Sequence, residues 1–183
     1  MAEQLRQLAL LLDRLAERTG RLLSWLSLAM VLVTFAVVVL RYGFDIGSIA
    51  LQESVTYLHA LLFMLCAAYT LKHDAHVRVD IFYQRTTPQV RAWIDLLGTL
   101  LMLFPVCIFI IYSSLDYVSA SWRIHEGSRE AGGLNAVFLL KTAIPVMAVL
   151  MLLQGISLAL HNLLQIIGHA LPSEPDTGMD REI

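Results

Sequence analysis

Charged residues are scarce in this sequence. Only 15% of its 183 residues are Asp, Glu, Lys or Arg, whereas soluble domains contain about 25%. The net charge of −2 offers no clustered basic face of the kind that nucleic-acid binding requires. The two cysteines, Cys66 and Cys107, lie inside apolar runs, which excludes a disulfide scaffold and a cysteine-rich metal site. With 57% hydrophobic residues and a mean hydropathy of +0.67, the composition predicts an integral membrane protein.

Four long runs of the chain contain no charged residue at all. A membrane-spanning helix needs about 20 apolar residues, because each residue adds about 1.5 Å to a path of roughly 30 Å. Helices are expected because lipid offers no hydrogen-bond partner, so the backbone N–H and C=O groups must bond to each other within the segment. We therefore predict an all-α membrane domain over residues 22–167, with four transmembrane helices over about 22–40, 54–71, 94–116 and 137–161.

The two ends of the chain differ from this membrane domain. In residues 1–20, Leu5, Leu8, Leu12 and Leu15 fall at helical spacing among charged residues. This pattern predicts an amphipathic arm helix in the plane of the lipid headgroups, which Gly20 ends before the first span. A frayed cytosolic tail is the alternative. The acidic residues 172–183 are expected to form a disordered cytoplasmic tail.

The distribution of lysine and arginine predicts the orientation in the membrane. Nine positive residues fall on the side of the two termini and the second connection: Arg6, Arg14, Arg18, Arg21, Lys72, Arg78, Arg85, Arg91 and Arg181. Four fall on the other side: Arg41, Arg123, Arg129 and Lys141. This asymmetry predicts that both termini are cytoplasmic and that, in a bacterial inner membrane, the first and third connections face the periplasm.

The spans offer little catalytic or cofactor chemistry. No P-loop, dinucleotide fingerprint, metalloprotease motif or activated nucleophile is present, so we expect no enzyme and no cofactor. His59 and His161 could hold a haem as a bis-histidine pair, but the topology places them at different depths. His73 and His76 are weak metal-ligand candidates, better explained as part of a charge network.

Three further features concern shape and surface. Pro105 and Pro145 lack the N–H of a helical hydrogen bond, so each predicts a local helix defect. The third connection mixes charge, an aromatic residue and glycines, which fits either a solvated turn or a docking surface for a soluble partner. The docking candidates are Trp122, Arg123, Glu126, Arg129 and Glu130.

The order of several short motifs resembles a known family. Arg41-Tyr42 closes the first predicted span, and Leu51-Gln-Glu53 opens the second. AAYTLKHDAHVRVD over residues 67–80 follows at the exit of the second span, and VFLLKTAIP over residues 137–145 opens the fourth. These features resemble the small membrane subunit, called DctQ, of tripartite ATP-independent periplasmic (TRAP) transporters, in the branch for mannitol and chloroaromatic compounds. The likeness extends from about residue 20 to 167.

The resemblance implies a noncatalytic scaffold subunit of a sodium-coupled importer of organic acids. Its expected partners are a large elevator-type membrane subunit (DctM-like), a periplasmic substrate-binding protein (DctP-like) and membrane lipid. Subunit-interface candidates, expected to pair with the large subunit or with each other, are Arg41, Glu53, His76, Arg78, Asp80 and Lys141. A haem-bearing redox anchor and a self-sufficient small-solute exporter are the alternatives.

Overall fold

Every regular element that the structure describes is helical. The computed structural model describes residues 2–76 and 86–168. Its elements are α1 (Ala2–Gly43), α2 (Ile49–Leu65), α3 (Ala67–Lys72), α5 (Pro88–Gly98), η1 (Thr99–Leu103), α6 (Phe104–Arg123) and α7 (Val137–Ile166). Four helical stretches are long and apolar enough to cross a membrane: Glu3–Gly43, Ile49–Lys72, Pro88–Arg123 and Val137–Ile166. The predicted all-α architecture with four membrane-crossing helices is therefore confirmed.

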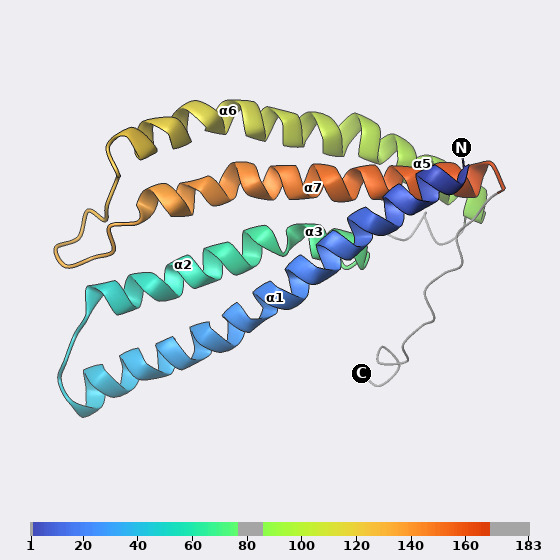
Figure 1. Cartoon of the computed structure of the whole chain (residues 1–183). Coiled ribbons are helices and arrows are strands. Elements are labelled where there is room, and N and C mark those ends of the chain that lie inside the picture. The colour runs from blue at the N-terminus through green and yellow to red at the C-terminus, as the bar shows by residue number, and fades with distance from the viewer. Residues whose placement is uncertain (1, 77–85, 169–183) are drawn as a thin grey trace.

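Helix α7 is the central element of the arrangement. It packs against α1, α2, α3, α5 and α6, whereas α1 packs mainly against α2, α3 and α7. The connections α1–α2 (residues 44–48) and α6–α7 (residues 124–136) lie at one end of the molecule, which we call the loop end (Figure 1). The start of α1 and the end of α7 lie at the opposite end, which we call the terminal end (Figure 1). The four spans therefore alternate in direction.

Small residues allow α7 to approach its neighbours closely. Ala143, Ala148 and Gly155 of α7 are buried. A Cβ atom at Gly155 would lie 2.7 Å from Cδ2 of Leu103 and 2.9 Å from Cε1 of Phe104. Lipid provides no hydrophobic drive for helices to associate, so membrane helices depend on close van der Waals contact of this kind. Gly155 thus fixes the packing of α7 against the start of α6.

The expectation that Gly20 ends an N-terminal arm helix is wrong. Helix α1 runs without interruption from Ala2 to Gly43, straight through Gly20. A glycine inside a helix costs only about 1 kcal/mol relative to alanine, and packing can offset that cost. Here a Cβ at Gly20 would overlap the ring of Tyr69, so the missing side chain makes room for α3 against α1. The glycine is a contact point and does not break the helix.

The packed face of the arm also differs from the predicted leucine stripe. Ala9, Leu12 and Ala16 are the buried apolar residues, each at most 9% exposed. Leu8 and Leu15 are 45% and 43% exposed. Two alanines flank the one buried leucine, Leu12, in this contact, which allows α1 to approach α7 and α3 closely.

The local defect predicted at Pro105 takes the form of a π-helical turn. Helix α6 is preceded by the five-residue turn η1, in which the N–H of Phe104 donates to the carbonyl of Thr99. This wider turn accommodates the proline, which has no N–H to donate. Pro145, in contrast, lies inside α7, which continues to Ile166.

Candidate functional site

The charged residues of the described chain gather at the two ends of the bundle, and the loop end holds most of the predicted site residues. Glu53, in the first turns of α2, accepts hydrogen bonds from the hydroxyl of Ser128 and from the N–H of Leu134, the latter at 2.6 Å. The N–H of Ser128 also donates to the carbonyl of Leu134 at 2.9 Å. A Cβ at Gly133 would lie 2.7 Å from Oε2 of Glu53. Glu53 therefore ties the α6–α7 connection to α2.

Glu126 forms a second tie within the same connection. Its Oε2 accepts from the hydroxyl of Ser121 at 2.7 Å and forms an ion pair with Lys141 near the start of α7. The Lys141 ammonium also lies over the ring of Tyr117, 3.9 Å from its centroid. The Lys141 ammonium and then the Ser121 hydroxyl hold the pKa of Glu126 below its ordinary value, because both stabilise the charged carboxylate. This cluster joins the end of α6 to the start of α7.

Trp122 anchors the end of α6 from a third direction. Its Nε1 donates to the hydroxyl of Thr142 at 2.9 Å, and its ring packs edge-on against Phe138, with 4.7 Å between centroids. The ring of His125 contacts Phe138 as well, at 5.6 Å. Trp122 remains 42% exposed. The α6–α7 connection is thus an ordered platform, held by Glu53, Glu126 and Trp122.

The other predicted site residues at the loop end point outward. Arg41, Arg123, Arg129 and Glu130 are all exposed. Arg123 makes one long contact, from Nη2 to the hydroxyl of Ser119 at 3.4 Å within its own helix. The structure therefore brings Glu53 and Glu126 onto one connection as its ties, while these four side chains remain available to solvent or to another chain.

Three predicted interface residues, His76, Arg78 and Asp80, follow α3 in the sequence. His76 is exposed in the bend after α3. Arg78 and Asp80 lie outside the described residues, and so does the acidic segment 172–183. Two other interface candidates, Glu53 and Lys141, are not paired with each other. Glu53 is bonded to Ser128, and Lys141 is paired with Glu126.

Sequence reasoning missed a buried polar cluster at the terminal end, where α1 crosses α7. Oδ1 of Asp13 accepts from the Ser157 hydroxyl at 2.6 Å and from the Gln154 amide at 3.0 Å. Oδ2 of Asp13 lies 2.8 Å from Nε2 of His161. The Ser157 hydroxyl also reaches the carbonyl of Ala9 at 3.1 Å. We call Asp13, Gln154, Ser157 and His161 the arm clamp, because it fastens the first turns of α1 to α7.

A second carboxylate on α1 fastens the same segment to α3. Glu17, one turn after Asp13, lies 2.8 Å from the Lys72 ammonium and 2.9 Å from Nε2 of His73. Its other oxygen accepts from Nε of Arg21 at 2.8 Å. The spacing of polar residues could have revealed both ties. Asp13 and Glu17 are four residues apart and share one face of α1. The polar residues of α7 recur every one or two turns within an otherwise apolar helix.

Neither the haem nor the metal alternative gains support from this geometry. His161 is bonded to Asp13, and the ring of His59 stacks against Phe63 of its own helix, with 6.3 Å between centroids. Within residues 2–76 and 86–168, no group of three His, Cys, Asp or Glu side chains could hold a metal ion.

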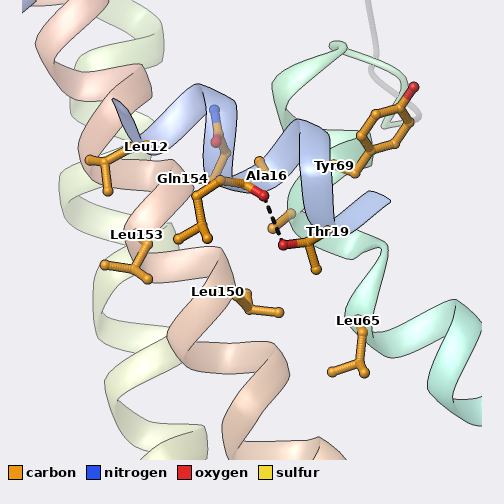
Figure 2. Close-up of a pocket in the computed structure, with 10 residues that line it drawn as sticks. Leu12, Ala16, Thr19, Leu65, Tyr69, Leu150, Leu153 and Gln154 are labelled. Carbon is orange, nitrogen blue, oxygen red and sulfur yellow. Dashed lines mark hydrogen bonds between the residues drawn. The ribbon is translucent and has the colours of Figure 1, made fainter. Parts of the chain in front are cut away.

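A small cavity lies where α1, α2, α3 and α7 meet (Figure 2). It is lined by Leu12, Leu15, Ala16, Thr19, Leu65, Ala68, Tyr69, Leu150, Leu153 and Gln154. The hydroxyl of Thr19 bonds back to the carbonyl of Leu15 at 2.7 Å, as the dashed line marks, and does not face a ligand. The lining is mostly apolar, with Thr19, Tyr69 and Gln154 as its polar residues, and the cavity is too small for an organic solute.

These features define a polytopic helical membrane protein. Polar contacts join its membrane-crossing helices at both ends of the bundle. A family model described as "Tripartite ATP-independent periplasmic transporters, DctQ component" matches residues 30–165, about three quarters of the chain. The chain belongs to this DctQ family, whose members are components of tripartite transporters. Comparison with curated proteins and with solved structures gave no significant match.

Proposed function

We propose that this chain is the noncatalytic small membrane subunit of a sodium-coupled TRAP importer of organic acids. In this role it braces the large DctM-like subunit and helps to dock the DctP-like binding protein. The family match over residues 30–165 is the observation that carries the proposal. The packing of α7 also supports it, because Ala143, Ala148 and Gly155 allow close helix contact and the buried polar residues Gln154 and Ser157 are bonded to Asp13 of α1. The mannitol and chloroaromatic branch remains a prediction.

The proposed orientation follows from charge. Nine of the thirteen lysines and arginines fall in the N-terminal segment, the connection between the second and third spans and the C-terminal segment of the sequence. We therefore place the terminal end and both termini in the cytoplasm of a bacterial cell, with the chain in the inner membrane. The loop end then faces the periplasm, where the binding protein is. This orientation supports a docking role for the α6–α7 connection.

We assign different roles to the charged residues of that connection. Glu126 and Glu53 position it, since both are occupied by partners within the chain. Arg123, Arg129 and Glu130 are exposed and are the proposed contacts with the binding protein, together with the exposed part of Trp122. Rim charges of this kind steer encounter and set association rates more than they add affinity.

The proposed contacts with the large subunit involve the two rims. Arg41 is exposed at the loop end of α1, and His76 is exposed at the terminal end. Arg78 and Asp80, which follow His76 in the sequence and lie outside the described residues, are proposed as contacts from the sequence alone. Lys141 and Glu53 contribute through the loop platform rather than by direct pairing with another subunit.

The experiment uses the complete three-component transporter in liposomes. The double charge reversal Arg123→Glu/Arg129→Glu is expected to leave co-purification with the large subunit unchanged. It should lower sodium-dependent uptake several-fold when binding protein is limiting, because the encounter is weakened. Asp116→Asn, at an exposed position of α6, is the matched control. Unchanged uptake by the double variant would remove the docking role. Uptake by this chain alone, without the large subunit, would overturn the noncatalytic role.

A further inference from the structure

The segment of α1 over residues 2–22 carries two different faces. One face is packed against the bundle: Ala9, Leu12 and Ala16 are nearly inaccessible, and Asp13 is bonded to α7. Because the arm clamp fixes the rotation of the helix about its axis, it also fixes which residues lie on the outside. The outer face is therefore a defined surface of the protein, because α1 cannot rotate about its axis without breaking the bonds of Asp13 to α7.

The outer face carries a strip of leucines. Leu8, Leu11, Leu15 and Leu22 are 45%, 61%, 43% and 73% exposed. They follow one another at intervals of three, four and seven residues, which places them along one side of a helix. A continuous apolar strip on an otherwise charged segment needs a covering surface, because water contact is unfavourable for each side chain.

Arginines run beside this strip. Arg14, Arg18 and Arg21 are spaced by three or four residues and are all exposed. Arg21 is bonded to Glu17 but its side chain remains 76% exposed. Arg14 and Arg18 have no acidic partner within residues 2–76 and 86–168. Two uncompensated guanidinium groups next to exposed leucines call for a partner that is both anionic and apolar.

The position along the helix shows where these groups stand relative to the bilayer. The charge-free run begins at Leu22. Arg18 precedes it by about 6 Å and Arg14 by about 12 Å along the axis, at about 1.5 Å per residue. The headgroup layer on each side of the hydrocarbon is about 5–8 Å thick. Because α1 runs obliquely to α7 (Figure 1), both guanidinium groups come within reach of headgroup phosphates. Leu22, at the start of the charge-free run, meets the edge of the acyl region.

We propose that this outer face, made of Leu8, Leu11, Leu15, Leu22, Arg14, Arg18 and Arg21, is a binding surface for anionic phospholipid. Its guanidinium groups bind the lipid phosphates, for which the planar fork of arginine is well suited. Its leucines insert at the boundary of the acyl chains. The inference depends only on the membrane placement of α1 and is independent of the transport role proposed above.

The test measures lipid binding to the purified full chain in detergent micelles, at low salt. Phosphatidylglycerol is titrated, with phosphatidylcholine as the neutral comparison, and thermal stabilisation gives the apparent affinity. Arg14→Gln/Arg18→Gln is expected to weaken apparent affinity for phosphatidylglycerol about 30-fold, since each arginine near an anionic surface contributes about a fivefold factor. Arg14→Lys/Arg18→Lys, which keeps the charge, is expected to retain most of the binding.

The matched control is Arg41→Gln/Arg123→Gln, which removes two exposed arginines from the loop end. It should leave phosphatidylglycerol binding unchanged. Equal stabilisation of the native chain by both lipids overturns the proposal, and so does equal weakening by both glutamine variants. If Arg14→Gln/Arg18→Gln leaves lipid binding intact but reduces co-purification with the large subunit, the face belongs to a protein contact and the proposal fails. Circular dichroism confirms that each variant keeps its helix content.

Discussion

The arm clamp makes a quantitative prediction for Asp13→Ala. The carboxylate accepts three hydrogen bonds, and each bond to a charged acceptor contributes about 1.5–3 kcal/mol. Two donors have an alternative: Ser157 also reaches the carbonyl of Ala9, and the side chain of His161 is 33% exposed to solvent. Gln154, only 4% exposed, would keep an unpaired amide. The expected loss in the free energy of unfolding is therefore about 2–4 kcal/mol.

The assay is thermal unfolding of the purified full chain in detergent. For a chain of this length, about 2–4 °C is lost per kcal/mol, so Tm should fall by about 5–15 °C. Asp13→Asn keeps one acceptor oxygen and should fall between the native chain and the alanine variant. Asp116→Ala, an exposed aspartate on α6, is the control and should change stability by about 0.5 kcal/mol or less. A shift for Asp13→Ala no larger than for this control would refute the reasoning.

The remaining predictions concern one contact and one titration. Gly20→Ala should lower Tm because its Cβ would overlap the ring of Tyr69, whereas Gly43→Ala, which meets nothing within 4 Å, should not; equal effects would contradict the proposed contact. The pKa of Glu126 is held below 4.5 by Lys141, so its contribution to the order of the α6–α7 connection is present above pH 4.5 and is lost as pH falls through the lowered pKa. At neutral pH, a protease active at that pH should therefore cleave the connection faster in Glu126→Gln than in the native chain. At low pH, an acid-active protease should cleave the two chains at more similar rates, because acid has protonated Glu126 in the native chain.

The apolar runs were sufficient to predict the spans, because a stretch without charge has one stable conformation in lipid. The path of α1 was not predictable in the same way. Gly20 looked like a helix end because local propensity argues for a break, but its neighbour Tyr69 lies far away in the sequence and fills the space that a side chain would need. Tertiary packing decided the outcome, and one sequence alone does not show that packing.

The polar ties were only partly visible in the sequence. Glu53 and Lys141 stood out because a charge at the edge of a span is conspicuous, yet their partners Ser128 and Glu126 come from a connection with no periodic pattern. Asp13 was hidden among the other charges of the arm, where a solvated face is the usual explanation. Its burial depends on the angle at which α1 crosses α7, and that angle is a property of the whole bundle.

The central place of α7 has a consequence for biosynthesis. It is the last of the four spans to leave the ribosome, yet it supplies the main packing surface of α6 and the partners of Asp13. Until α7 enters the membrane, α6 lacks its main packing partner among the described helices, and the carboxylate of Asp13 lacks the three donors that α7 supplies. Helices α1, α2 and α3 can already pack against one another, because Glu17 pairs with Lys72 without α7, and insertion of the final helix completes the bundle.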